Sequence, residues 1–206
     1  MSTRPDGPGP KPRLDKEEHV TTTLWLTGLP SSGKSTLGRE LVERLRDRRA
    51  VQHLDGDAVR KDFFPELGFS KHDRTENIRR IGKLAAMLAS HGVLSVVSVI
   101  APFREVREEV RAAHEAAGLT FVEVYVDAPV QVCAERDVKG LYAKADAGQV
   151  EAMTGVSDVY EAPASPDVLV DTASLSVQES IEMIERALER CESERREQDI
   201  REVVLR

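Results

Sequence analysis

The segment from Gly28 to Ser35 reads GLPSSGKS and matches the pattern G-x-x-x-x-G-K-[S/T]. It follows the apolar run Leu24–Thr27 directly and leads into an amphipathic segment that begins at Lys34. Glycines at these positions allow backbone N–H groups to point inward, and the amino-terminus of a following helix adds positive potential. The sequence therefore predicts a loop between a strand and a helix that binds the phosphates of a nucleoside triphosphate.

Two side chains of this loop are expected to do chemistry. Lys34 is expected to meet the β- and γ-phosphates as a catalytic residue, and Ser35 to be a ligand of Mg²⁺. A Gly/Ser turn without function is the alternative, but the pattern arises by chance in only about one chain in a hundred of this length. The residues expected to bind ATP are Gly28, Ser31, Ser32, Gly33, Lys34, Ser35 and Thr36.

Short apolar runs alternate with amphipathic segments along the rest of the chain. The apolar runs are TTLWLTG, VQHLDGD, VLSVVSVIAP, TFVEVYVDAP and DVLVDT. The amphipathic segments are 34–48, 71–91, 103–117, a short one at 130–136 and a long one from Ser176. Strands that alternate with helices predict an α/β fold with a five-stranded parallel sheet and helices on both faces.

Local signals mark several helix boundaries. Ser70-x-x-Asp73 and Ser176-x-x-Glu179 resemble capping boxes, and Gly92 and Gly118 fall where a helix should end. Between these signals, Ile78, Ile81, Leu84, Ala85 and Leu88 repeat at helical spacing and are expected in the core.

The chain of 206 residues is expected to hold one domain at 21–190. Residues 1–20 are rich in Pro, Gly and charge and are predicted to be a disordered leader, and 191–206 to be a charged helical tail. Residues 138–160 show little apolar periodicity, which favours a mobile lid.

Composition limits the possible partners. A net charge of −7 argues against a general nucleic-acid binder, which needs a basic face. The sequence has no apolar run long enough for a membrane span and no signal-peptide pattern, so we expect a cytoplasmic protein. Cys133 and Cys191 are far apart and are interpreted as ordinary thiols.

The second predicted strand ends in Asp55-Gly-Asp57, close to where the phosphates should lie. One carboxylate could accept a proton from an attacking hydroxyl and the other could help to hold a hydrated metal. Solvated acids in an Asp-Gly turn are an even alternative. A set of cations favours the functional interpretation, because guanidinium groups suit phosphate or sulfate oxygens. The set is Arg60, Arg74, Arg79, Arg80, Arg104, Arg107, Lys139 and Lys144.

With these residues in place, the sequence resembles the adenylyl-sulfate kinase family from about Thr23 to Thr172. The strings that carry the resemblance are the phosphate loop, LDGDAVR, LGFSKHDRTENIRRIG, APFREVR, VEVYVDAPVQVC, ERDVKGLYAKADAG and TGVSDVYEAP. The resemblance implies a P-loop kinase fold, usually dimeric, with a lid around KGLYAKADAG. It implies transfer of the γ-phosphate of ATP to the 3′-hydroxyl of adenylyl sulfate (APS), with Mg²⁺, in sulfate activation.

The resemblance also implies roles for single residues. Asp55 would be the likelier base toward the 3′-hydroxyl, Arg136 would lie by the adenine of ATP, and Phe69 would pack on the adenine of the acceptor. Packing in the core is the other interpretation of Phe69. The residues implied to bind the acceptor are Arg60, Phe69, Arg74, Asn77, Ile100, Lys139, Leu141, Lys144 and Met153.

Three positions depart from the family pattern. Ala58 stands where Asn is frequent, Ala101 where Ser is frequent, and Met153 where Phe is frequent. These changes leave two alternatives open. One is a related kinase that phosphorylates a different nucleotide or metabolite hydroxyl, and the other is a nucleotide-binding module without catalysis. The presence of Lys34 and Ser35 together with both aspartates argues against the second.

Overall fold

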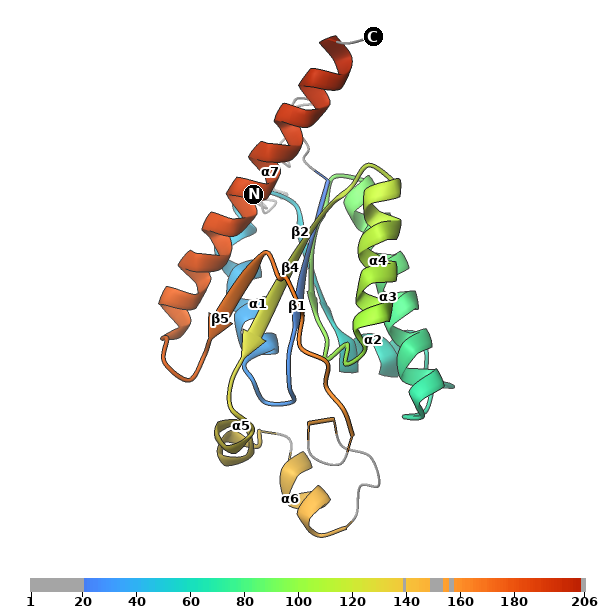
Figure 1. Cartoon of the computed structure of the whole chain (residues 1–206), viewed down its shortest axis with the longest axis vertical. Helices are drawn as coiled ribbons and strands as arrows, with labels where there is room; N and C mark the ends of the chain where they lie inside the picture. Colours follow the sequence, from blue (N-terminus) through green and yellow to red (C-terminus); the bar gives the residue numbers. More distant parts are fainter. Residues whose placement is uncertain (1–20, 139, 149–153, 156–157, 205–206) are drawn as a thin grey trace, which may run out of the picture.

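A computed structural model describes residues 21–138, 140–148, 154–155 and 158–204 of the chain. Its centre is a sheet of five parallel strands in the order β2-β3-β1-β4-β5 (Figure 1). The strands are β1 (Thr22–Thr27), β2 (Val51–Asp55), β3 (Leu94–Ser98), β4 (Thr120–Asp127) and β5 (Val168–Asp171). Each lies within one of the apolar runs, so the predicted sheet is confirmed.

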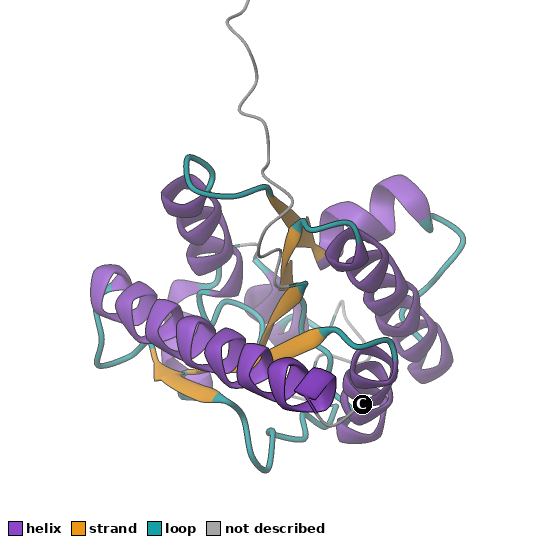
Figure 2. Cartoon of the chain, turned by 90° about the horizontal axis from the view of Figure 1, so that it is seen from above, coloured by secondary structure: helices purple, strands orange, loops and turns teal. Residues whose placement is uncertain are grey.

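Helices cover both faces of the sheet, which Figure 2 shows as a layer between them. One face packs against α1 (Lys34–Leu45) and α7 (Val177–Val204). The other packs against α2 (Gly56–Phe63), α3 (Lys71–Ser90) and α4 (Arg104–Ala116). Two short helices, α5 (Val130–Arg136) and α6 (Leu141–Asp146), lie beyond the carboxyl ends of the strands (Figure 1).

Each face of the sheet has its own apolar cluster. The cluster under α1 and α7 includes Leu26, Leu41 and Ile184, and the cluster under α3 and α4 includes Trp25, Ile81 and Val110. A methyl group at Gly82 would approach Val110 to 2.8 Å, so the absence of a side chain there lets α3 and α4 pack closely. Burial on both faces explains why the inner strands read as continuous apolar runs.

The local boundary signals are confirmed. The Asp73 N–H donates to Ser70 Oγ, and Ser176 and Glu179 exchange hydrogen bonds as a complete capping box. Gly92 and Gly118 have φ angles of 76° and 72°, the left-handed conformation that ends a helix. Helices α2 and α6 were not predicted, because both are too short to show clear periodicity.

Candidate active site

The loop from Gly28 to Gly33 connects β1 to α1 at the point where the sheet order reverses. Strand β1 has β3 on one side and β4 on the other, and ligands of open α/β sheets bind outside the strand ends at such a point. A methyl group at Gly28 would lie 2.2 Å from the Val126 carbonyl oxygen, so only glycine fits between β1 and β4. Gly33 has φ 105° and precedes the first residue of α1, Lys34.

Ser35, in the first turn of α1, contacts Asp55 at the end of β2. Ser35 Oγ donates to Asp55 Oδ2 at 2.6 Å, and Asp55 Oδ1 accepts from the N–H groups of Asp57 and Ala58 at the start of α2. The Lys34 ammonium is buried and contacts the Leu29 carbonyl and Ser32 Oγ. A hydroxyl beside a carboxylate provides the hard oxygen ligands that Mg²⁺ prefers.

Arg60 and Phe69 form a wall near Asp57. The Arg60 guanidinium lies 4.9 Å from the centre of the Phe69 ring and donates to the Gly68 carbonyl. Burial lowers the pKa of Arg60, and the nearby Asp57 carboxylate opposes that shift. Phe69 is 72% exposed, which excludes the interpretation that it fills the core. Its ring is available to a ligand.

Arg74 and Asn77 lie one turn apart on α3 and are 9% and 3% exposed. Arg74 Nε donates to the Phe69 carbonyl at 2.7 Å, while Nη1 contacts Thr154 Oγ1 at 2.9 Å and Asp158 Oδ2 at 2.7 Å. Arg74 therefore joins the Phe69 wall to the segment predicted to be the lid. Among the described residues, no hydrogen-bond partner faces the buried Asn77 Oδ1.

Several of the eight cations predicted to meet an anionic ligand have partners within the described chain. Arg79 forms a two-pronged ion pair with Glu109, and Arg80 pairs with Glu66 and Glu76. Arg107 is buried against Glu123, and the Arg104 guanidinium donates to the Ala162 carbonyl. These carboxylates and carbonyls lie far away in sequence or on the adjacent helix turn, so composition alone could not reveal the pairing.

The described part of 138–160 contacts the phosphate loop. Tyr142 on α6 donates its hydroxyl to the Pro30 carbonyl at 3.1 Å, and the backbone at Gly155 lies directly against Leu29. Leu141 packs into a small apolar cluster with Tyr142, and Lys144 is exposed on α6. Lys139 and Met153 lie outside the described residues.

Arg136, at the end of α5, reaches the phosphate loop through Thr172. Its Nη1 donates to Thr172 Oγ1 at 3.0 Å and its Nη2 to the Thr172 carbonyl at 2.6 Å. Thr172 Oγ1 in turn donates to the Ser32 carbonyl at 2.8 Å. Three residues of this region were not predicted individually from the sequence: Thr172, Asp158 and Tyr160. The sequence does contain a signal for Glu123. It is a charged residue inside an apolar run, and a buried carboxylate there needs a buried partner.

No helix in the described ranges is both long and apolar enough to cross a membrane. Within the same ranges, no three acidic, histidine or cysteine side chains gather as a metal-binding group.

The doubly wound sheet, the phosphate loop at its switch point and the acidic turn beside it define a P-loop kinase. The family model of adenylylsulphate kinase matches residues 20–171. The chain belongs to the adenylyl-sulfate kinase family.

Individual relatives agree. An adenylyl-sulfate kinase from Myxococcus xanthus is 54% identical over 147 residues, which are 71% of this chain and 80% of the relative. One from Picosynechococcus is 47% identical over 172 residues, 83% of this chain and 95% of the relative. The solved Mycobacterium tuberculosis APS kinase in complex with AMPPNP and APS superposes with a TM-score of 0.78 at 40% identity, covering 82% of this chain and 97% of that one.

Proposed function

We propose that this chain transfers the γ-phosphate of ATP to the 3′-hydroxyl of adenylyl sulfate, giving ADP and 3′-phosphoadenylyl sulfate. The observation that carries the proposal is the Ser35–Asp55 contact. It joins the start of α1, directly after the phosphate loop, to the acidic turn that follows β2, and β2 is separated from β1 in the sheet only by β3. A donor phosphate at Lys34 and an acceptor hydroxyl at the DGD turn would then meet across this contact. Membership of the family supports the same reaction.

The residues around the phosphate loop support a division of roles on the ATP side. Lys34 would bind the β- and γ-phosphates, and the backbone of Gly28 and Ser31 to Gly33, with Ser35 and Thr36, would cradle them. Ser35 would hold Mg²⁺, which neutralises charge that develops on the transferred phosphoryl group. Arg136 would lie beside the adenine, because its contacts with Thr172 bring it to the edge of the loop.

The two aspartates would divide the remaining work. Asp55 accepts hydrogen bonds from Ser35 and from two backbone N–H groups at the start of α2. That arrangement suits Asp55 to orienting Ser35 and the hydrated metal, although the family resemblance assigns it as the base. Asp57, on the Arg60 side of the turn, is the second candidate base, and comparison of Asp55→Asn with Asp57→Asn would separate the two roles.

On the acceptor side, Phe69 would stack on the adenine and the cations would bind the phosphate and sulfate oxygens. Three observations support this arrangement: the Phe69 ring is exposed, the Arg60 guanidinium lies over that ring, and Arg74 donates to the Phe69 backbone carbonyl. The buried oxygen of Asn77, which has no hydrogen-bond partner among the described residues, would meet a donor of the acceptor. The family resemblance adds Ile100, Lys139, Leu141, Lys144 and Met153 to the residues proposed to bind the acceptor.

The deciding experiment measures ADP release with ATP, Mg²⁺ and each of three acceptors: adenylyl sulfate, AMP and adenosine. We expect turnover with adenylyl sulfate at least about 10²-fold above the other two, because only adenylyl sulfate carries both anionic groups. Mass spectrometry and phosphorus NMR of the product should place the new phosphate on the 3′-oxygen. Lys34→Ala should remain folded and lose turnover. Preference for another acceptor would contradict the proposal.

The homodimer that the family resemblance implies also stays a proposal. A hexameric APS kinase from Thiobacillus denitrificans aligns with this chain over 29% of its own length. Sedimentation velocity of the full chain would distinguish a dimer from a monomer or a larger assembly.

A further inference from the structure

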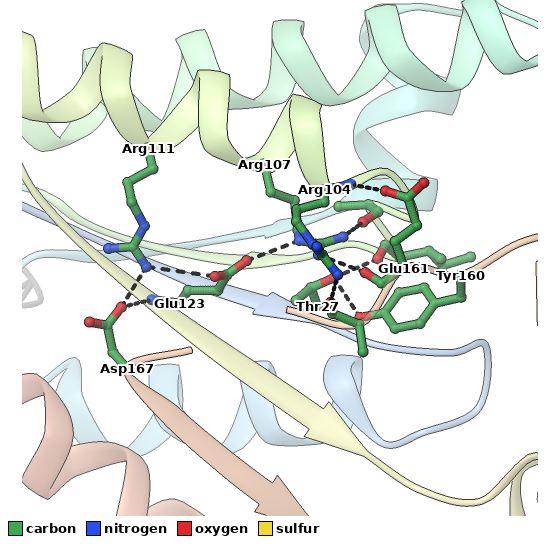
Figure 3. Close-up of polar contacts among 11 residues, drawn as sticks. Thr27, Arg104, Arg107, Arg111, Glu123, Tyr160, Glu161 and Asp167 are labelled. Carbon is green, nitrogen blue, oxygen red and sulfur yellow. Dashed lines mark hydrogen bonds and ion pairs between the residues drawn. The ribbon is translucent and has the colours of Figure 1, made fainter. Parts of the chain in front are cut away.

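Arg107 on α4 is a buried arginine whose guanidinium contacts three different parts of the chain (Figure 3). Its Nε donates to Glu123 Oε1 on β4 at 3.0 Å, its Nη1 to the Ala101 carbonyl at 2.6 Å and its Nη2 to the Glu161 carbonyl at 2.7 Å. The residue is only 2% exposed. Burial of a charge at this depth requires partners on several sides.

Charge balance alone explains only one of these contacts. Glu123 neutralises the guanidinium, and Arg111, one turn further along α4, lies 3.7 Å from the other Glu123 oxygen and 2.7 Å from Asp167. Burial raises the pKa of Glu123, while the two arginines oppose that shift. The Nη contacts with Ala101 and Glu161 go to two neutral carbonyls, and a planar fork of donors is what allows one side chain to reach both.

The first of these carbonyls belongs to the loop that follows β3. Ala101 has a φ of 44°, a left-handed conformation that strains a residue with a side chain. The preceding carbonyl, that of Ile100, accepts a 2.6 Å hydrogen bond from Thr27 Oγ1 at the end of β1. A methyl group at Gly56 would come within 2.7 Å of the Val99 side chain, so this loop borders the Asp55–Asp57 turn.

The second carbonyl, that of Glu161, lies just after the 138–160 segment. The Glu161 N–H donates to the Pro102 carbonyl at 2.9 Å, and the Glu161 carboxylate accepts from the Arg104 N–H at 2.7 Å. The neighbouring Tyr160 ring lies 5.9 Å from the Arg107 guanidinium, and its hydroxyl is 3.1 Å from Thr27 Oγ1 (Figure 3). The end of the segment is thereby fastened to the loop at 100–104.

We infer that Arg107 is a positioning residue for the acceptor. Its hydrogen bonds to the Ala101 and Glu161 carbonyls fix the position of the loop after β3 relative to the end of the 138–160 segment. The Tyr160–Thr27 contact is a second link between the same two regions, because Thr27 also donates to the Ile100 carbonyl. This inference rests on the proposed function, because it assigns the loop to the acceptor side. Arg107 acts through these backbone groups and not by contact with the reacting atoms.

The test compares Arg107→Lys with the matched control Arg111→Lys in the full chain. A lysine at 107 keeps the positive charge beside Glu123 but cannot hold both carbonyls, whereas Arg111 contacts neither Ala101 nor Glu161 in the described structure. For Arg107→Lys we expect the KM for adenylyl sulfate to rise at least about tenfold, with the KM for ATP changed less than about twofold. Arg111→Lys should keep both constants within about twofold of the wild type.

A folded Arg107→Lys variant with unchanged acceptor kinetics would overturn the inference, as would equal changes in both KM values. If Arg107→Lys does not fold, Tyr160→Phe decides, because it removes one hydroxyl and keeps the ring. Tyr160→Phe should raise the acceptor KM by a smaller factor than Arg107→Lys. An unchanged KM would reject the inference that the Tyr160–Thr27 contact helps to position the acceptor. Wild-type protein that is inert toward adenylyl sulfate but active on another acceptor would contradict the proposed function, and the same comparison on that acceptor would still test Arg107.

Discussion

Replacement of Arg74 by lysine should reduce kcat/KM for the acceptor substantially and leave the KM for ATP almost unchanged. Arg74 donates charge-assisted hydrogen bonds to the Phe69 carbonyl at 2.7 Å, Thr154 Oγ1 at 2.9 Å and Asp158 Oδ2 at 2.7 Å. A lysine ammonium at the same position can retain the bond to Asp158 but cannot reach back to Phe69 at the same time. At least one of these hydrogen bonds is therefore broken, and the wall that carries the Phe69 ring is no longer held in its orientation.

The size of the effect follows from the hydrogen bonds that lysine cannot replace. A hydrogen bond to a charged group is worth about 1.5–3 kcal/mol, and the lower value applies here because Asp158 is partly exposed to solvent. Breaking one or two such bonds costs about 1.5–3 kcal/mol, which is about a 10- to 100-fold decrease in kcat/KM for the acceptor. The KM for ATP should change less than about threefold, because these three bonds do not involve the phosphate loop.

Steady-state kinetics with each substrate varied in turn provide the measurement. Arg79→Lys is the matched control, since Arg79 lies on the same helix in an exposed pair with Glu109 and should change neither constant by more than about twofold. Asn77→Ala should also raise the acceptor KM, because it removes the buried oxygen proposed to meet the acceptor. Equal effects of Arg74→Lys on both substrates would refute the reasoning and make Arg74 a structural residue.

Three further predictions concern other parts of the molecule. Limited proteolysis of the ligand-free protein should cut within 138–160, and ADP plus adenylyl sulfate should protect it, whereas identical cleavage in both states would argue against a lid. Ala101 has no nucleophile, so incubation with radiolabelled ATP alone should leave the protein unlabelled, and transfer should proceed with inversion at phosphorus; a kinetically competent phosphoenzyme would disprove direct transfer. Burial lowers the pKa of His114 from its ordinary 6.5, and the hydrogen bond from Nδ1–H to the Val110 carbonyl opposes that shift. Below about pH 6.5 the unfolded chain then binds the extra proton, so the free energy of unfolding should fall as pH drops, and His114→Gln should reduce that slope in urea titrations.

Patterns that act over a few residues determined much of the fold in advance. The phosphate loop, the five strands and the two capping boxes all depend on periodicity, glycine conformations or side-chain caps within about one helix turn. A chain that alternates apolar strands with amphipathic helices has few ways to bury both faces of a parallel sheet. For that reason the phosphate loop after β1 and Asp55 at the end of β2 could be expected to lie near one another.

Tertiary structure alone decided which of the predicted cations pair with carboxylates of the described chain, and with which ones. The sequence grouped Arg107 and Arg79 with Arg74 as cations for an anion, yet Arg107 pairs with Glu123 on β4 and Arg79 with Glu109 on α4. Such pairs form between residues that are distant in the chain, and the choice depends on how helices pack on the sheet. An arginine has the same composition and helical spacing whether it meets a ligand or a buried carboxylate, because only the burial and the partner supplied by the folded chain distinguish the two.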